Sequence, residues 1–275
     1  MPLLLLSFGA IAAVIARPQR TVPVRLLCIA LAFAGLFAPV FVAKPGPVRT
    51  LLAFAMVMGL FRTIQMLREE HPLRVRVLST LLFVDLQAQS KTSHGAWFLV
   101  VRTLVLGAVS AVSLVYVERA PLMIGALYVV SSATVVDGIA RLIGFAFGQS
   151  WGAFHDDPWL SRSLAEFWGK RWNRIVSHWL KSHVYVPAAS RTGPVGGVFA
   201  TFLASAALHF YPTLVSTDLR NACMMGAYFL LQAVLVLVEK SLPDGRWKRP
   251  YAFAALLGPL PLFIFPLLRS LGFPV

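Results

Sequence analysis

The chain has 275 residues, of which 58% are hydrophobic and only 13% are charged, and its mean hydropathy is +0.74. This composition is too apolar for a soluble fold of that size and predicts a polytopic membrane protein. The formal net charge of +14 does not indicate nucleic-acid binding, because the basic residues lie in short connections between apolar runs. The two cysteines, Cys28 and Cys223, have no spacing typical of a metal site or a disulfide framework.

Apolar windows long enough to cross a ~30 Å hydrocarbon layer predict an all-α transmembrane helical bundle that forms a single membrane-embedded domain over 1–275. About eight spans are expected, and the first is short enough to lie in the interface instead. In chain order the expected spans are 2–16, 26–43, 48–67, 96–117, 121–148, 194–211, 221–238 and 251–271.

The basic residues in the connections predict the orientation of these spans. Alternate connections carry 17 Lys and Arg residues on one side and five on the other. Because cytoplasmic loops carry the excess of Lys and Arg, the richer side is expected in the cytoplasm and both termini outside. A bacterial inner membrane and an endoplasmic reticulum membrane both satisfy this prediction.

Two long cytoplasmic segments are expected to hold interfacial or re-entrant helices. In the first, the apolar run 77–86 is typical of a helix that lies in the interface. In the second, 149–193, hydrophobic residues recur at helical spacing from Leu164 to Trp179, which predicts an amphipathic helix on or dipping into the membrane. Asn173 falls at the border of its apolar face.

The stretch 167–173, Phe-Trp-Gly-Lys-Arg-Trp-Asn, combines aromatic and basic side chains with a carboxamide. One interpretation is a membrane-surface anchor, with tryptophans in the interface and cations on lipid phosphates. The other is a binding surface for a polyanionic cosubstrate with an apolar tail. Asn173 favours the second interpretation, because a phosphate anchor needs no amide. The candidate substrate-binding residues are Trp168, Lys170, Arg171, Trp172 and Arg174, together with Ser205 in a later span.

His209 lies in an otherwise small and apolar predicted span. Burial disfavours the imidazolium, so a neutral ring that can accept a proton as a general base is expected. The alternative is an interfacial histidine bonded to water or to a carbonyl. Ser205, one turn earlier on the same face, is a candidate for orienting the ring, although serines in small-residue helices also serve packing.

Three other polar groups have simpler interpretations. Asp137 and Arg141, four residues apart in a predicted span, are expected to form an ion pair. The cluster 155–157 before Pro158 predicts a helix-entry turn and matches no metal-ligand pattern. The glycine-containing loop 191–197 lacks the phosphate-loop pattern and predicts a turn that opens the sixth span.

The strings 163–173, 184–187 and 205–209 together resemble the wax synthase branch of the membrane-bound O-acyltransferase (MBOAT) superfamily, with a motif core of about 160–212. The resemblance implies an enzyme that transfers an acyl group from acyl-CoA to the hydroxyl of a lipophilic alcohol, with His209 and Asn173 as the catalytic pair. Acyl-CoA is then a cosubstrate, and neither a metal nor a bound cofactor is expected. The implied partners are acyl-CoA, the alcohol acceptor and the lipid bilayer.

Two alternatives stay open. A related acyltransferase would act on a sterol, a terpenoid or another small hydroxylated acceptor. A non-enzymatic transporter or lipid-binding protein would place Asp137, Arg141 and His209 along a path, although no internal repeat supports it. The predicted topology puts His209 near the outer end of its span, so the enzyme hypothesis requires the segment 160–186 to dip inward or a tunnel to join it to His209.

Overall fold

The computed structural model describes residues 11–18, 20–42, 44–73, 76–77, 95–146 and 154–275. The regular elements in these ranges are all helical, as predicted. They are α2 (Val22–Leu36), α3 (Ala38–Val42), α4 (Pro47–Met66), α6 (Ala96–Tyr116), η1 (Val117–Arg119), α7 (Pro121–Ala146), η2 (Pro158–Leu160), α8 (Leu164–Glu166), η3 (Phe167–Arg171), α9 (Arg174–Leu180), η4 (Lys181–Tyr185), α10 (Val186–Ser216), α11 (Leu219–Ser241), α12 (Lys248–Leu257) and α13 (Pro261–Ser270).

Six of the described helical stretches are long and apolar enough to cross a membrane, and α12 with α13 forms a bent pair that makes a seventh. They correspond in position to seven of the eight expected spans. The other, 2–16, lies mostly outside the described residues, as does the interfacial helix expected at 77–86. The protein is an integral, multi-pass membrane protein.

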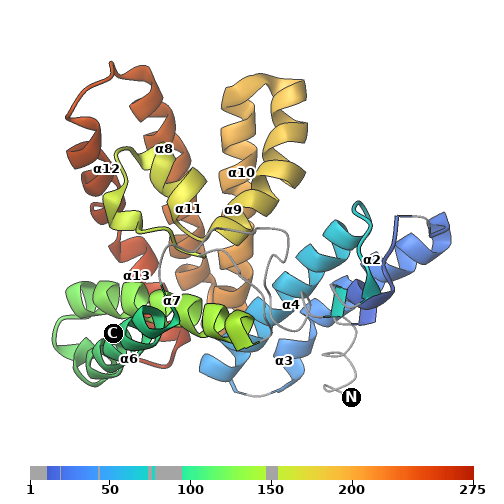
Figure 1. Ribbon diagram of the computed structural model, residues 1–275, viewed down its shortest axis with the longest axis horizontal. Coiled ribbons are helices and arrows are strands. Elements are labelled where there is room, and N and C mark those ends of the chain that lie inside the picture. Colours follow the sequence, from blue (N-terminus) through green and yellow to red (C-terminus); the bar gives the residue numbers. More distant parts are fainter. Residues whose placement is uncertain (1–10, 19, 43, 74–75, 78–94, 147–153) are drawn as a thin grey trace.

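Helices α10 and α11 form the centre of the bundle (Figure 1). Helix α4 packs on α10, α13 packs on α11 and on α7, and α6 pairs with α7. The largest group of buried apolar side chains joins α8, α10, α11 and α12, and includes Leu164, Phe202, Phe229 and Ala252. The short helix α8 is therefore part of the main core.

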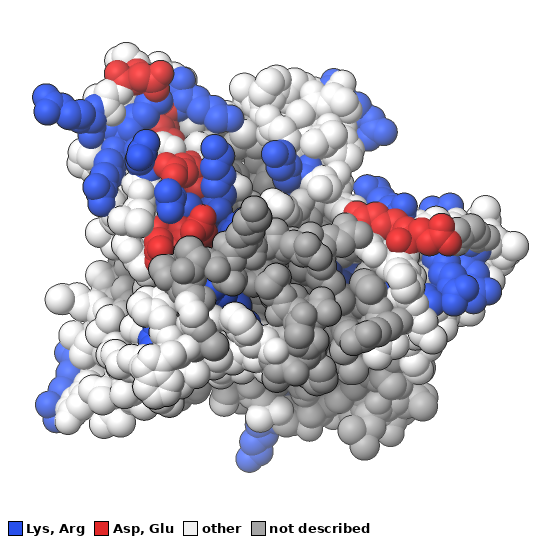
Figure 2. All heavy atoms as spheres, viewed as in Figure 1, with Lys and Arg blue, Asp and Glu red and all other residues white. Residues whose placement is uncertain are grey.

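Lys and Arg side chains gather over the end of the molecule where α8, α12 and the upper part of α10 lie, and a second group lies at the side, near α2 (Figure 2). On the face shown, few of them lie at the opposite end. This separation follows the charge asymmetry expected from the sequence. The assignment of the richer end to the cytoplasm stays a prediction.

Residues 174–216 form a helical hairpin. The continuous helical assignment of α10 contains one residue with non-helical geometry, Gly193, at φ 75° and ψ 174°. Only glycine adopts this conformation readily, and Pro194, with its fixed φ, starts the next arm. The two arms lie side by side and meet at the top of Figure 1. The turn predicted at 191–197 is confirmed.

Candidate active site

Residues 164–173, called here the tryptophan-rich segment, do not form part of one continuous amphipathic helix. The prediction of such a helix from Leu164 to Trp179 is therefore wrong. The segment consists of α8, the π-helix η3, extended backbone at Trp172 and a left-handed residue, Asn173, before α9 begins at Arg174. Asn173 has φ 40° and ψ 60°, a conformation that asparagine tolerates better than most residues. Hydrophobic spacing does not report such a break, because residues on both sides of it still pack on the bundle.

Two polar side chains of α11 hold this segment against the core. The Glu239 carboxylate is 2% exposed and accepts the backbone N–H groups of Leu164 at 2.6 Å and of Ala165 at 2.9 Å. Fully buried Gln232 accepts the indole N–H of Trp168 at 3.1 Å and donates to the carbonyl of Ala255 at 2.9 Å. These bonds satisfy polar groups that packing removes from solvent, and they fix the position of Trp168.

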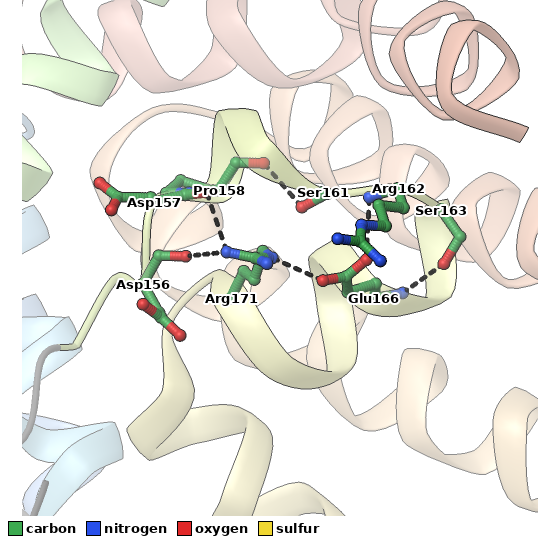
Figure 3. A network of polar contacts seen from close by, with 8 residues as sticks. All are labelled: Asp156, Asp157, Pro158, Ser161, Arg162, Ser163, Glu166 and Arg171. Atoms are coloured by element: carbon green, nitrogen blue, oxygen red, sulfur yellow. Dashed lines mark hydrogen bonds and ion pairs between the residues drawn. The ribbon is translucent and has the colours of Figure 1, made fainter. Parts of the chain in front are cut away.

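Arg171 closes the segment from the other side (Figure 3). Its Nε donates to Glu166 at 2.7 Å and its Nη1 donates to the carbonyl of Asp156 at 3.0 Å. Burial raises the pKa of Glu166, but the backbone N–H of Arg162 and the Arg171 guanidinium outweigh it and hold that pKa below its usual value. The Arg171 guanidinium thus binds a carboxylate and a carbonyl of the protein itself, and these bonds order the turn around η3.

His209 lies on the second arm of the hairpin, among aromatic rings from three other helices. Its ring stacks on Phe229 at 4.1 Å between centroids, with Phe54 at 6.1 Å and Phe263 at 6.4 Å. Its Nδ1 lies 2.8 Å from the carbonyl oxygen of Ser205. A carbonyl only accepts, so Nδ1 carries the proton and the lone pair of a neutral ring is on Nε2. The main chain of Ser205, and not its hydroxyl, orients the imidazole.

The aromatic rings connect His209 to the tryptophan-rich segment. The Trp168 ring lies 5.9 Å from Phe229, whose ring stacks on His209. One phenylalanine therefore separates the Trp168 indole from the imidazole.

The hairpin brings Asn173 and His209 to the same level along the bundle. Gly197 lies so close to Tyr185 on the facing arm that a Cβ at Gly197 would come within 2.9 Å of the ring. Asn173 is twelve residues before Tyr185, and His209 is twelve residues after Gly197. Equal numbers of residues on the two arms therefore separate this contact from Asn173 and from His209, although the first arm is slightly shorter because it includes the π-helix η4.

Helix α4 gives an independent measure of this register. Trp179 stacks on Phe61 at 3.8 Å, and its indole N–H donates to the Phe61 carbonyl. The ring near His209, Phe54, lies seven residues before Phe61, about 10 Å along α4, and Asn173 lies six residues before Trp179, about 9 Å along α9. Both counts indicate a similar depth for Asn173 and His209, whereas the sequence-based topology separates them.

The other candidate residues occupy different environments. Lys170 is exposed and Arg174 is half-buried, and neither side chain forms a hydrogen bond or ion pair with the described residues. The Trp172 ring stacks on Phe167 at 5.6 Å and meets the ring of His155 at 4.5 Å. Burial lowers the pKa of His155 to about 4, and the positive charge of Arg102 acts in the same direction.

The predicted pair of Asp137 and Arg141 is confirmed, with 3.7 Å between Oδ2 and Nη1 and both side chains buried. The helix-entry turn predicted before Pro158 is also confirmed, since η2 begins there. Sequence reasoning missed Gln232 and Glu239. Both residues interrupt an apolar run, Gln232 within it and Glu239 at its end. Because polar side chains in a membrane span need hydrogen-bond partners, their positions could have indicated a structural role.

The comparison with known protein families concerns this same part of the chain. Residues 151–231 match the family model described as the Membrane bound O-acyl transferase family. The matched segment is similar to this family. It contains the tryptophan-rich segment, both arms of the hairpin and the first half of α11.

Three curated relatives match over similar lengths. The probable long-chain-alcohol O-fatty-acyltransferase 2 of Arabidopsis thaliana is 29% identical over 121 residues, which are 40% of this chain and 34% of the relative. The acyl-CoA–sterol O-acyltransferase 1 of Arabidopsis thaliana is 32% identical over 110 residues, 36% of this chain and 32% of the relative. The diacylglycerol O-acyltransferase 1 of Dictyostelium discoideum is 32% identical over 95 residues, 34% of this chain and 15% of the relative.

The chain thus spans about a third of the length of the two plant relatives. The resemblance to the wax synthase-like branch, inferred from the sequence motifs, is confirmed.

Proposed function

We propose that this protein is an acyl-CoA-dependent O-acyltransferase that esterifies the hydroxyl of a lipophilic alcohol, with His209 as general base and Asn173 as its partner. The observation that carries the proposal is the orientation of His209. Its Nδ1 proton is held by a main-chain carbonyl, which leaves the basic Nε2 among aromatic rings. The family match over 151–231 and the names of the plant relatives support the reaction class.

In the proposed reaction, Nε2 of His209 accepts the hydroxyl proton as the alcohol oxygen attacks the thioester carbonyl. The tetrahedral oxyanion then collapses, the C–S bond breaks and the ester forms. The departing thiolate of coenzyme A takes the proton from the imidazolium, so the ring is neutral again. No covalent acyl-enzyme is needed, because the alcohol attacks the thioester directly.

Asn173 has two possible roles in this scheme, and each uses its carboxamide. The NH₂ group would donate to the oxyanion, or the amide would orient the acceptor hydroxyl toward His209. The side chain makes no hydrogen bond with any described residue, so both its donors and its acceptor are available. Its register with His209 along the hairpin supports this pairing.

Lys170 and Arg174 are the cations that we assign to the phosphates of acyl-CoA. Both flank the Asn173 turn, and neither is used by a carboxylate of the described chain. Arg171 has a different part, because Glu166 and the carbonyl of Asp156 already occupy its guanidinium. Trp168 and Trp172 would line the apolar side of the same approach.

The acceptor that we favour is a long-chain alcohol, since relatives named for that reaction match this chain at 27–37% identity. A sterol is the second candidate, because one relative is named as a sterol O-acyltransferase at 32% identity.

Purified protein supplied with labelled acyl-CoA and a panel of long-chain alcohols, sterols and diacylglycerol tests the activity. Labelled ester from one acceptor class supports the proposal and identifies the acceptor. Thioester that stays intact with every acceptor, in protein that is folded by tryptophan fluorescence, contradicts it.

Substitutions at Asn173 separate its chemical role from its backbone conformation. Asn173→Gly keeps the left-handed geometry and removes the carboxamide, whereas Asn173→Asp keeps the geometry and shape but loses the donor. We expect both variants to fold and to lose about 100-fold in kcat, in line with the loss of a donor to an oxyanion. Wild-type kcat in Asn173→Gly would mean that the asparagine serves only the turn.

A further inference from the structure

Asn173 occupies a conformation that few non-glycine residues adopt, and such a residue persists only where its surroundings fix it. The surroundings in question are residues 154–157, called here the 154–157 segment. It lies between the α6–α7 pair and the tryptophan-rich segment and is joined to both by polar contacts.

On one side, buried charges of α6 and α7 hold the 154–157 segment. Oδ1 of Asp137 accepts the backbone N–H of Phe154 at 2.5 Å, and Oδ2 of Asp137 lies 3.7 Å from Arg141. Arg102 of α6 lies 3.9 Å from Asp157. Asp137 is 2% exposed and Arg141 is 5% exposed. The position of the Asp137 carboxylate is therefore determined by its protein partners and not by solvent.

On the other side, the 154–157 segment contacts every residue next to Asn173. In chain order, the N–H of Asp156 donates to the carbonyl of Arg171 at 2.8 Å, the ring of His155 meets Trp172 at 4.5 Å, and the N–H of Arg174 donates to the carbonyl of Phe154 at 2.8 Å. The turn is therefore held before and after Asn173 by a segment that is itself bonded to α7.

We propose that Asp137, supported by Arg141, is a positioning residue that fixes the Asn173 turn through Phe154. The carboxylate does not reach the reacting atoms. It holds Phe154 N–H, the carbonyl of Phe154 holds Arg174 N–H, and the direction of the Asn173 side chain depends on that backbone. This inference rests on the proposed function only for its kinetic consequence, because the contacts exist whatever the reaction is.

Loss of the pair is therefore expected to loosen the turn and to lower kcat without weakening acyl-CoA binding. A displacement of a catalytic group by about 1 Å can cost up to 100-fold in rate, so a loss of roughly tenfold or more is expected. Asp137→Ala alone strands the Arg141 charge in the interior and risks misfolding. The double variant Asp137→Ala/Arg141→Ala removes both charges and avoids this problem.

The variant Asp137→Asn/Arg141→Ala provides the rescue. The amide oxygen at position 137 still accepts the N–H of Phe154, and no unpaired charge is left in the interior. Thr134→Val is the matched control, because Thr134 is a buried polar residue one turn earlier on α7 whose hydroxyl bonds only within the helix, to Val130.

Hydrogen exchange of peptides covering 154–157 and 171–175, measured by mass spectrometry, is the direct test, with kcat and KM for acyl-CoA measured on the same samples. We expect faster exchange in both peptides of Asp137→Ala/Arg141→Ala and a lower kcat with KM within about twofold of wild type. Exchange and kcat should recover toward wild type in Asp137→Asn/Arg141→Ala. Exchange and kcat in Asp137→Ala/Arg141→Ala that match those of Thr134→Val would overturn the positioning role. Wild-type protein without transferase activity would contradict the proposed function, while the exchange data would still decide the positioning role.

Discussion

Glu239 is the residue whose substitution most sharply tests how the tryptophan-rich segment is held. Its carboxylate is buried and accepts two backbone N–H groups at the start of α8. Each buried N–H left without a partner costs about 1–3 kcal/mol, so Glu239→Ala should lower the free energy of unfolding by about 3 kcal/mol. For a chain of this size that corresponds to a fall in Tm of about 6–12 °C.

The assay is thermal unfolding in detergent, followed by the fluorescence of the tryptophans, several of which lie in or near this segment. Glu239→Gln retains one acceptor oxygen, so about half of the loss, roughly 1.5 kcal/mol, is expected. Lys240→Ala, at the exposed neighbouring position, is the control and should leave Tm unchanged. Equal Tm values for Glu239→Ala and Lys240→Ala would refute the conclusion that Glu239 anchors α8.

Two further substitutions test the turn of the hairpin and the half-buried ring of His155. Gly193→Ala forces a side chain into a backbone conformation that is essentially restricted to glycine. The free energy of unfolding should therefore fall by about 1–3 kcal/mol. An unchanged free energy of unfolding would mean that the two arms do not turn at this residue. His155 takes up its proton below pH 6.5 when unfolded but only near pH 4 when folded, so stability should fall as the pH decreases from 6.5 toward 4. Relative to His155→Phe, wild type should lose about 2 kcal/mol between pH 7 and pH 4.5. Parallel pH profiles would contradict the lowered pKa of this ring.

The membrane-spanning helices could be predicted because long apolar runs in lipid have few alternatives to helix. Seven expected spans have counterparts among the described helices, and the pair of Asp137 and Arg141 followed from its spacing alone. The candidate pair, Asn173 and His209, came from motif strings in the sequence, and its chemistry stays a prediction.

The environment of that pair could not be read from the sequence, because it depends on contacts between distant segments. The rings around His209 come from α4, α11 and α13, and no local pattern specifies which phenylalanines of those helices face it. The left-handed geometry of Asn173 was hidden for a similar reason. Hydrophobic spacing continued across the break, and the bonds that hold it come from Phe154 and Asp156.

His209 is the central element of the account, and its substitution tests it most directly. Purified His209→Ala and His178→Ala should be compared for the rate of ester formation from labelled acyl-CoA and the preferred acceptor, after equal folding is established by thermal unfolding. His178 is an exposed histidine on α9 and serves as the control. Loss of a general base predicts a rate at least about 100-fold lower in His209→Ala and unchanged in His178→Ala. Ester formation by folded His209→Ala at the wild-type rate would contradict the account.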